Sequence, residues 1–324
     1  MKIPDYQYAI SECDVPKVRQ AALGDYRVFR KKCLEYMRGD ATTSVMNQVH
    51  DLAWKTAVFR TLNEARRIEP YRMINGAMWE LIVDGYVCVM ALGVRKLVDR
   101  HPDTDSVWNV LASVEKRPEL LTREKFVCYD GLPFDYQQIH TDHINGLDLG
   151  AGQSVNWIPT QGPKAWGTSR MLHLAFDKLA GTSDTSKRKK TDSIQNGLLL
   201  KLKDMLAHPA IERVCAMADK VFAHAERVEE SGSGQAVATF DDVDEALKQI
   251  VRVANFLSSS FFYDTTFVSV VATPQFNVFD GLDEPWIQTE NLPVLSRYWD
   301  DLCKQMDSWS STDAVDFFST PKLP

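Results

Sequence analysis

Residues 74–100 read INGAMWELIVDGYVCVMALGVRKLVDR, and this stretch decides the fold class. Its apolar residues recur at spacings of three and four and also occupy the sides between, which predicts a helix that is apolar over most of its surface. We therefore expect the central helix of a bundle, buried on most sides and stopped by Pro102. The residues on which this rests are Leu81, Ile82, Val83, Tyr86, Val87, Val89, Met90, Leu92, Leu97 and Val98.

Amphipathic patterns on both sides of this stretch predict further helices and a mostly all-α fold. The clearest begins at Thr239, where Thr239 and Asp242 form a capping-box pattern and apolar residues from Val243 to Phe261 follow on one face. No succession of strand patterns occurs, so several long amphipathic helices with polar breaks indicate a helical bundle. The expected ranges are 42–69, 107–114, 171–180, 194–206, 209–225, 239–261 and 293–309.

The domain organisation follows from a change of character after residue 120. Residues 1–120 supply the N-terminal helices of the bundle, and residues 171–324 are expected to complete the same bundle. Between them, residues 121–170 interleave glycines with Phe and Trp residues. Glycine breaks helices, whereas aromatic residues are scarce in disordered segments, so we expect an ordered but irregular insertion.

The totals restrict the class of protein. The 324 residues carry a net charge of −7, which excludes a globally basic protein but not a local basic face. The six cysteines form no CxxC pair, and free thiols in a reducing compartment are the expected state. The first residues contain no apolar signal segment, and the longest apolar run, Tyr86 to Val94, is too short to cross a bilayer. We expect a cytoplasmic protein without membrane contact.

Two basic features are candidate contacts for phosphate groups. On the helix predicted from Pro209, a ridge beside the apolar face carries Arg213, Lys220, His224 and Arg227 at helical spacing. The second feature is the loop run Lys187, Arg188, Lys189 and Lys190, since such clusters bind phosphates by releasing counterions. Ordinary solvated side chains are the alternative explanation for both.

His140 and His143 are the only candidates for a metal site. With Asp142 or Asp148 they would supply two imidazoles and a carboxylate, but no third ligand is defined and a hydrogen-bonded loop is the alternative. No Walker loop, nucleophile elbow or dinucleotide fingerprint is present in the sequence. We therefore expect no cofactor and no metal.

The order of two pairs of segments resembles the HEPN superfamily, in particular its abortive-infection branch. The first pair is Ala91–Arg100 followed by Asp105–Leu111, and the second is Ala218–His224 followed by the Thr239–Asp242 helix start. Together they cover about residues 42–115 and 190–262. The resemblance implies a HEPN-like helical bundle, a role in defence and assembly as a homodimer.

The resemblance also implies a candidate ribonuclease site. Catalytic members carry an Arg, four to six residues and then a His, which stabilise the phosphate and assist attack by the ribose 2′-hydroxyl. Aligning His224 with that histidine places Ala218 at the arginine position and Asp219 beside it. Lys220 or Arg213 would then have to assist His224. Arg95 and His101 have the right spacing, but they lie on another helix and His101 precedes a proline.

Three functions follow from these patterns. The favoured one is a non-catalytic HEPN-like module that binds RNA, a nucleotide or a partner protein, because an alanine cannot stabilise a phosphate. The first alternative is a metal-independent endoribonuclease toxin that uses His224. The second is a structural or interaction bundle unrelated to the family.

Overall fold

The computed structural model describes residues 3, 5–39, 42–70, 75–146, 159–219, 238–264, 269–271, 273–284 and 287–308. These residues form helices joined by loops, with one isolated bridge between Thr122 and Ser193 and no strand among them. The all-α fold class is therefore confirmed. The chain divides into two compact units, Met1–Ala272 and Thr273–Pro324, whereas the sequence grouped residues 171–324 with a single bundle.

Each range that the sequence predicted to be helical contains a helix. In chain order the first unit contains α1 (Gln20–Arg38), α2 (Val45–Ile68), α3 (Gly76–Leu97), α4 (Val107–Lys116), α5 (Arg123–Cys128), α6 (Tyr136–Asn145), α7 (Trp166–Ala180), α8 (Asn196–Leu206), α9 (Pro209–Met217) and α10 (Phe240–Phe256). Of these, α1, α5 and α6 are additional helices that the sequence did not predict. A π-helical turn, Leu257–Phe261, continues α10.

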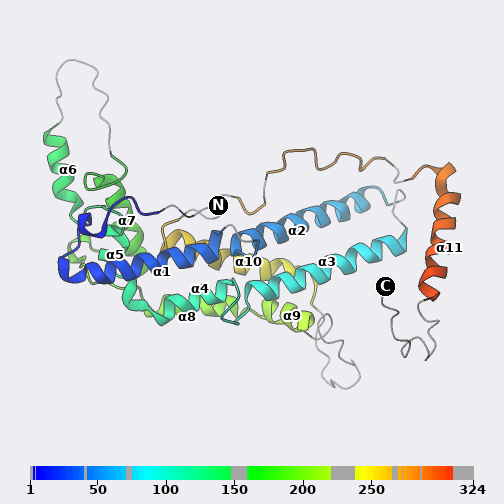
Figure 1. Ribbon diagram of the computed structural model, residues 1–324, viewed down its shortest axis with the longest axis horizontal. Helices are drawn as coiled ribbons and strands as arrows, with labels where there is room; N and C mark the ends of the chain where they lie inside the picture. Colours follow the sequence, from blue (N-terminus) through cyan, green and yellow to red (C-terminus); the bar gives the residue numbers. More distant parts are fainter. Residues whose placement is uncertain are drawn as a thin grey trace, which may run out of the picture. The chain divides into compact units, whose positions relative to one another are not determined.

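The bundle is built from helices that run along one another (Figure 1). α1 and α2 follow each other along one side, α3 and α4 return along the other, and α8, α9 and α10 pack against them. α10 carries its apolar face into the centre, as its pattern predicted, and the capping box at its start is formed. The Thr239 Oγ1 accepts a hydrogen bond from the Asp242 amide at 3.1 Å, and an Asp242 carboxylate oxygen accepts one from the Thr239 amide at 2.9 Å.

The N-terminal segment contributes more to the core than its weak pattern indicated. α1 buries apolar and aromatic side chains along its whole length, although residues 1–40 read as polar and only lightly amphipathic. Three of its arginines, Arg27, Arg30 and Arg38, are also largely buried. The Arg30 guanidinium donates to the carbonyl of Phe262 at 2.6 Å, and Arg38 forms an ion pair with Asp264 at 2.6 Å. These contacts satisfy groups at the end of the π-helical turn.

The central helix is the main correction to the sequence-based fold. α3 buries Tyr86, Met90 and Val94, yet its first half leaves Leu81 69% exposed. By length and composition α3 is apolar enough to cross a membrane, a property that core helices share, and 22% of its most apolar window is buried. The expectation of burial on most sides was wrong because α10, which begins with Phe240 beside Phe59 and Tyr86, covers only the later part of α3.

Residues 121–170 are more regular than expected. The part of this segment that the structure describes contains α5, α6 and the start of α7, which pack together at one end of the bundle (Figure 1). Gly131 and Gly162 have positive φ angles, and a side chain at either position would collide with the ring of Tyr8. The glycines therefore serve the close approach of the N-terminal segment to this region.

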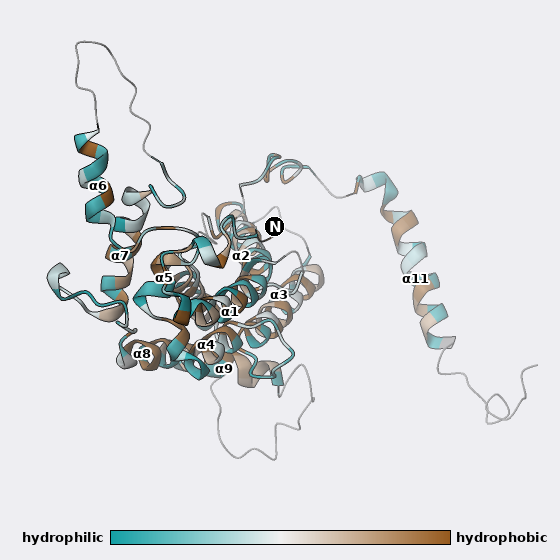
Figure 2. Cartoon of the chain, turned by 60° about the vertical axis from the view of Figure 1, so that its left-hand side comes forward, coloured by the Kyte–Doolittle hydropathy of each residue, from teal (hydrophilic) through white to brown (hydrophobic). Residues whose placement is uncertain are grey.

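The second unit contains one α-helix among its described residues, α11 (Leu292–Ser308), preceded by the short 3-10 helix Thr289–Asn291. Figure 2 shows apolar and polar stretches alternating along α11. Its apolar residues include Leu295, Tyr298 and Trp299, which are exposed. The helix itself confirms the range expected at 293–309.

Candidate functional site

The candidate site lies where α9 ends beside the last turn of α3. Pro209 occupies the first position of α9, and the side chain of His208 accepts a hydrogen bond from the Ala210 amide at 3.2 Å. One face of α9 enters the core and continues to Ala218, whose side chain is fully buried. An arginine at position 218 would therefore place its charge in the core, so the residue aligned with the family arginine faces away from any ligand.

Arg213 lies on the exposed flank of α9, where the sequence predicted it. Its guanidinium forms an ion pair with the carboxylate of Asp242 in the first turn of α10. The pKa of Asp242 is lowered to about 2, first by the hydrogen bond from Arg213 and then by the amide of Thr239. Arg213 therefore joins α9 to the start of α10, and its charge is already balanced.

Arg95 reaches the same end of α9 from α3. Its Nε forms an ion pair with the carboxylate of Asp219, the residue that follows Ala218. Both side chains are 44% exposed, and the hydrogen bond that Arg95 donates to Asp219 raises the pKa of Arg95. The structure thus brings a guanidinium from α3 next to the position where α9 itself lacks one.

His101 lies in the loop that follows α3. Its ring is largely exposed and lies 3.9 Å from the carboxylate of Asp103. The Asn109 side chain holds this loop by donating to the carbonyls of His101 and Thr104, the latter at 2.9 Å. Arg95 and His101 therefore belong to different elements, a helix terminus and a loop, and the pair contains no direct contact that the structure describes.

Three predicted site residues fall outside the described part of the chain. They are Lys220, His224 and Arg227, which lie in the stretch of sequence that begins after Asp219. Their predicted roles in catalysis and phosphate binding stay predictions.

The basic loop 187–190 divides into two kinds of residue. Arg188 is largely buried: it pairs with the carboxylate of Asp177 at 2.5 Å and donates to the Tyr136 hydroxyl at 3.1 Å. Lys190 lies 3.5 Å from the buried carboxylate of Glu124, with its ammonium 4.9 Å from the centre of the Phe134 ring. Lys187 is 78% exposed and Lys189 is also exposed, so only two of the four cations are oriented toward solvent.

Arg123 is the ion-pairing residue that the sequence did not single out. Its side chain is 0% exposed, and it pairs with Asp177 at 2.7 Å and with Asp192 at 2.9 Å. The hydrogen bonds from Arg188 and Arg123 outweigh the effect of burial on Asp177, so the pKa of that carboxyl lies below its usual range. The Lys187–Lys190 loop is therefore anchored to a buried charge network that joins α5 to α7.

His140 and His143 lie on one face of α6 and contact the same aromatic ring. Their ring centres are 4.3 Å and 6.1 Å from that of Trp166. Within the described residues no group of three or more potential metal-ligating side chains gathers here or elsewhere. Asp148, named as a possible third ligand, lies outside that range.

The electrostatics of the site follow from these pairs. Arg95, Arg213 and Arg188 each have a carboxylate partner, so an incoming phosphate would have to displace Asp219, Asp242 or Asp177. The corner formed by α3, α9 and the loop after α3 is therefore polar and nearly neutral among the described residues. It can orient a polar ligand or a partner side chain without supplying a strong positive field.

The chain matches one protein family over most of its length. The profile of the HEPN_AbiU2 family, described as AbiU2, matches residues 40–278, which include α2 to α10. No curated protein and no solved structure matches the chain. The match spans both segments that resembled HEPN proteins and excludes a bundle unrelated to the family. The chain belongs to the AbiU2 family, a HEPN-type family of abortive-infection proteins.

Proposed function

We propose that this abortive-infection protein acts as a non-catalytic binding module, and that it engages a partner protein rather than cutting RNA. The observation that carries the proposal is the buried position of Ala218, together with the pairing of Arg95 by Asp219. Cleavage by the ribose 2′-hydroxyl needs a cation at the phosphate and an acid/base beside it. The described end of α9 offers a paired cation and a buried methyl group instead.

The remaining basic residues support the same choice. Binding of RNA depends on cations that release counterions from the phosphate backbone, and the net charge of the chain is −7. Arg188, Arg213 and Arg95 are ion-paired within the fold. We propose a cytoplasmic location because all six cysteines are free, as expected in a reducing compartment. We also propose that the chain forms a homodimer.

A cleavage assay tests the proposal most directly. The full chain is incubated with end-labelled total RNA, with and without Mg²⁺, beside His224→Ala and Arg95→Ala variants. We expect no cleavage by the wild type. Cleavage that disappears in both variants would contradict the proposal.

The second candidate function is a metal-independent endoribonuclease in which Arg95 replaces the missing arginine. The observation that favours it is the contact of Arg95 with Asp219, one residue beyond Ala218. Asp219→Asn separates the two candidates, because it removes the competing carboxylate and leaves the Arg95 guanidinium available to a phosphate. An increase in cleavage rate for Asp219→Asn would support the nuclease, whereas no cleavage by either protein supports the binding module.

A further inference from the structure

An apolar groove runs between α2 and α3, next to the start of α10, where Phe240 contacts Phe59 and Tyr86. It encloses about 300 Å³ and is open to solvent along the two helices. The Phe59 and Tyr86 rings, stacked at 3.9 Å, form part of its lining. The other lining residues are Trp54, Lys55, Val58 and Leu62 from α2, and Ile82, Gly85 and Val89 from α3.

Exposed apolar side chains also occur on α2 and α3 outside the lining of the groove. Met78, Leu81, Gly85 and Val89 follow one another at spacings of three and four on α3, so they share one face. Leu81 is 69% exposed, and Ile68 at the end of α2 is 64% exposed. Single exposed apolar residues are ordinary, but a contiguous apolar patch marks a surface that binds another molecule.

Gly85 at the groove indicates what kind of molecule the surface accepts. Glycine is unfavourable inside a helix, and Gly85 lies in the middle of α3 without a positive φ angle. A Cβ built at this position meets no atom within 4 Å, so the fold of one chain does not require the glycine. A missing side chain there lets the backbone of another helix approach closely.

Charge at the edges of the groove favours a second copy of this chain. On the α2 side, Lys55 pairs with Asp51 and Arg67 pairs with Glu64, whereas Arg66 has no ion-pair partner among the described residues. The Arg66 guanidinium stacks 3.9 Å from the centre of the Trp79 ring, and its Nε is buried without a hydrogen-bond partner among those residues. The outer edge of α3 carries Glu80 and Asp84, which are exposed and form no ion pair with a described residue. An α3 helix from another copy brings an apolar face with an acidic edge to an apolar groove beside which Arg66 lacks an ion-pair partner among the described residues.

We propose that the α2–α3 groove is the surface through which two copies of this chain associate. The face of α3 formed by Met78, Leu81, Gly85 and Val89 from each copy lies against the groove of the other, and Arg66 of each copy faces the acidic edge of the other α3. The proposal rests on the homodimer proposed above and assigns its surface. Stable interfaces use about 20–30 residues from each side, and the exposed residues of the stretches 54–68 and 76–89 would form the centre of such a surface.

The test compares the association of variants of the full chain by sedimentation velocity over a range of concentrations. Gly85→Arg places a long charged side chain in the groove, where the structure of one chain leaves open space. Gly197→Arg is the matched control, because this α8 glycine also faces open space but lies outside the groove. We expect the dissociation constant of Gly85→Arg to rise at least about tenfold, and that of Gly197→Arg to stay unchanged. Circular dichroism is used to check that both variants are folded.

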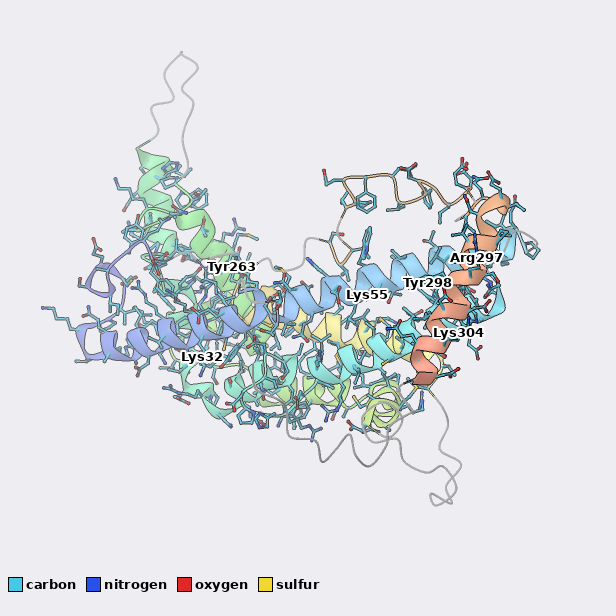
Figure 3. All side chains as sticks on the ribbon, turned by 45° about the vertical axis from the view of Figure 1, so that its right-hand side comes forward. Lys32, Lys55, Tyr263, Arg297, Tyr298 and Lys304 are labelled. Carbon is cyan, nitrogen blue, oxygen red and sulfur yellow. The ribbon has the colours of Figure 1, made fainter. Side chains whose placement is uncertain are left out.

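A charge exchange provides a second, independent readout. In Figure 3, Lys55 is labelled on α2, the helix that also carries Arg66. Arg66→Glu alone and the Glu80→Lys/Asp84→Lys pair alone should each weaken association, and the triple variant should restore it. Such rescue is not expected if the changes act only on the fold of one chain.

The outcomes separate the two proposals. A monomeric wild type overturns both the homodimer and its surface. A dimeric wild type whose association is unaffected by Gly85→Arg overturns this surface and leaves the homodimer standing. Binding of the wild type to phosphatidylcholine vesicles that Gly85→Arg abolishes would assign the groove to a lipid and overturn the proposal. Weaker association of Gly85→Arg, with rescue of the charge variants, supports it.

Discussion

Arg123 and Arg95 are both arginines paired with aspartates from distant parts of the chain, but they lie in opposite environments. Arg123 is buried between α5 and α7, where Asp177, Asp192 and Arg188 complete a network of two positive and two negative charges. Arg95 and Asp219 meet at the surface, where water reaches both side chains. The first network must stay neutral for the fold to be stable, whereas the second pair can open to admit a ligand.

This difference indicates which of the two arginines is able to bind a ligand. Separating a buried cation from its carboxylate costs free energy, because both charges are then left unpaired away from water. Arg188 therefore cannot leave Asp177 to bind a phosphate without destabilising the fold. An exposed pair contributes little to stability and is free to exchange partners. The candidate site therefore centres on Arg95 rather than on the loop 187–190, although the loop has the denser positive charge in the sequence.

The largest expected effect comes from removing the buried charge. Arg123→Met leaves Asp177 and Asp192 without their shared partner, and we expect the free energy of unfolding to fall by about 3–5 kcal/mol. Urea denaturation followed by circular dichroism measures the change. Arg123→Lys keeps a charge but loses the guanidinium fork, and should lose part of that stability. A loss below about 1 kcal/mol in Arg123→Met would contradict the structural role of the network.

His173, a buried residue of α7, should make the free energy of unfolding depend on pH. Burial lowers the pKa of His173 to about 4, whereas an unfolded chain binds the proton near pH 6.5. As the pH falls, the unfolded state therefore binds a proton at this histidine before the folded state does. The free energy of unfolding should decrease between about pH 6.5 and about pH 4, by at most about 3 kcal/mol.

Comparing the wild type with His173→Gln over this pH range isolates the contribution of the histidine. The glutamine can still donate to the carbonyl of Phe134, which lies 3.0 Å from the His173 Nε2, but it does not titrate. We expect a flatter stability profile in the variant. Parallel profiles for the two proteins would show that His173 does not carry the pH dependence.

Two residues of the basic loop should respond differently to the same change. Arg188→Ala removes charge-assisted hydrogen bonds to Asp177 and Tyr136 and should cost about 2 kcal/mol. Lys187→Ala removes an exposed ammonium and should change the free energy of unfolding by less than about 0.5 kcal/mol. Thermal or urea unfolding of both variants gives the comparison. Equal losses would contradict the buried pairing of Arg188 with Asp177.

Removal of the exposed ion pair should also have only a small effect on stability. Arg95→Ala removes its contact with Asp219 and should cost less than about 1 kcal/mol, because both side chains are solvated. The loss should shrink further in 0.5 M NaCl, since salt screens exposed pairs. A loss as large as that of Arg123→Met would remove the distinction between the two sites.

Much of the helical fold was predictable because helices depend on residues close in sequence. Thr239 and Asp242 predicted the start of α10, and the spacing of apolar residues by three and four predicted the helix that begins at Pro209. The family resemblance also rested on local motifs, and the family match confirmed it. The contacts of the candidate-site residues were harder to predict from the sequence. Arg95 could be named from its spacing to His101, but its neighbour Asp219 lies 124 positions away.

Local patterns determine which segments become helical, since hydrogen bonds and capping contacts join residues within a turn or two. Local patterns do not determine which helices pack against one another, as the exposure of α3 shows. Its apolar surface predicted burial on most sides, yet the start of α10 leaves the first half of α3 exposed. The pairing of Arg123 and Arg188 with Asp177 likewise depends on α5, α7 and the loop meeting in space. Burial and charge pairing are properties of the packed chain, because they depend on which distant residues exclude water from a side chain.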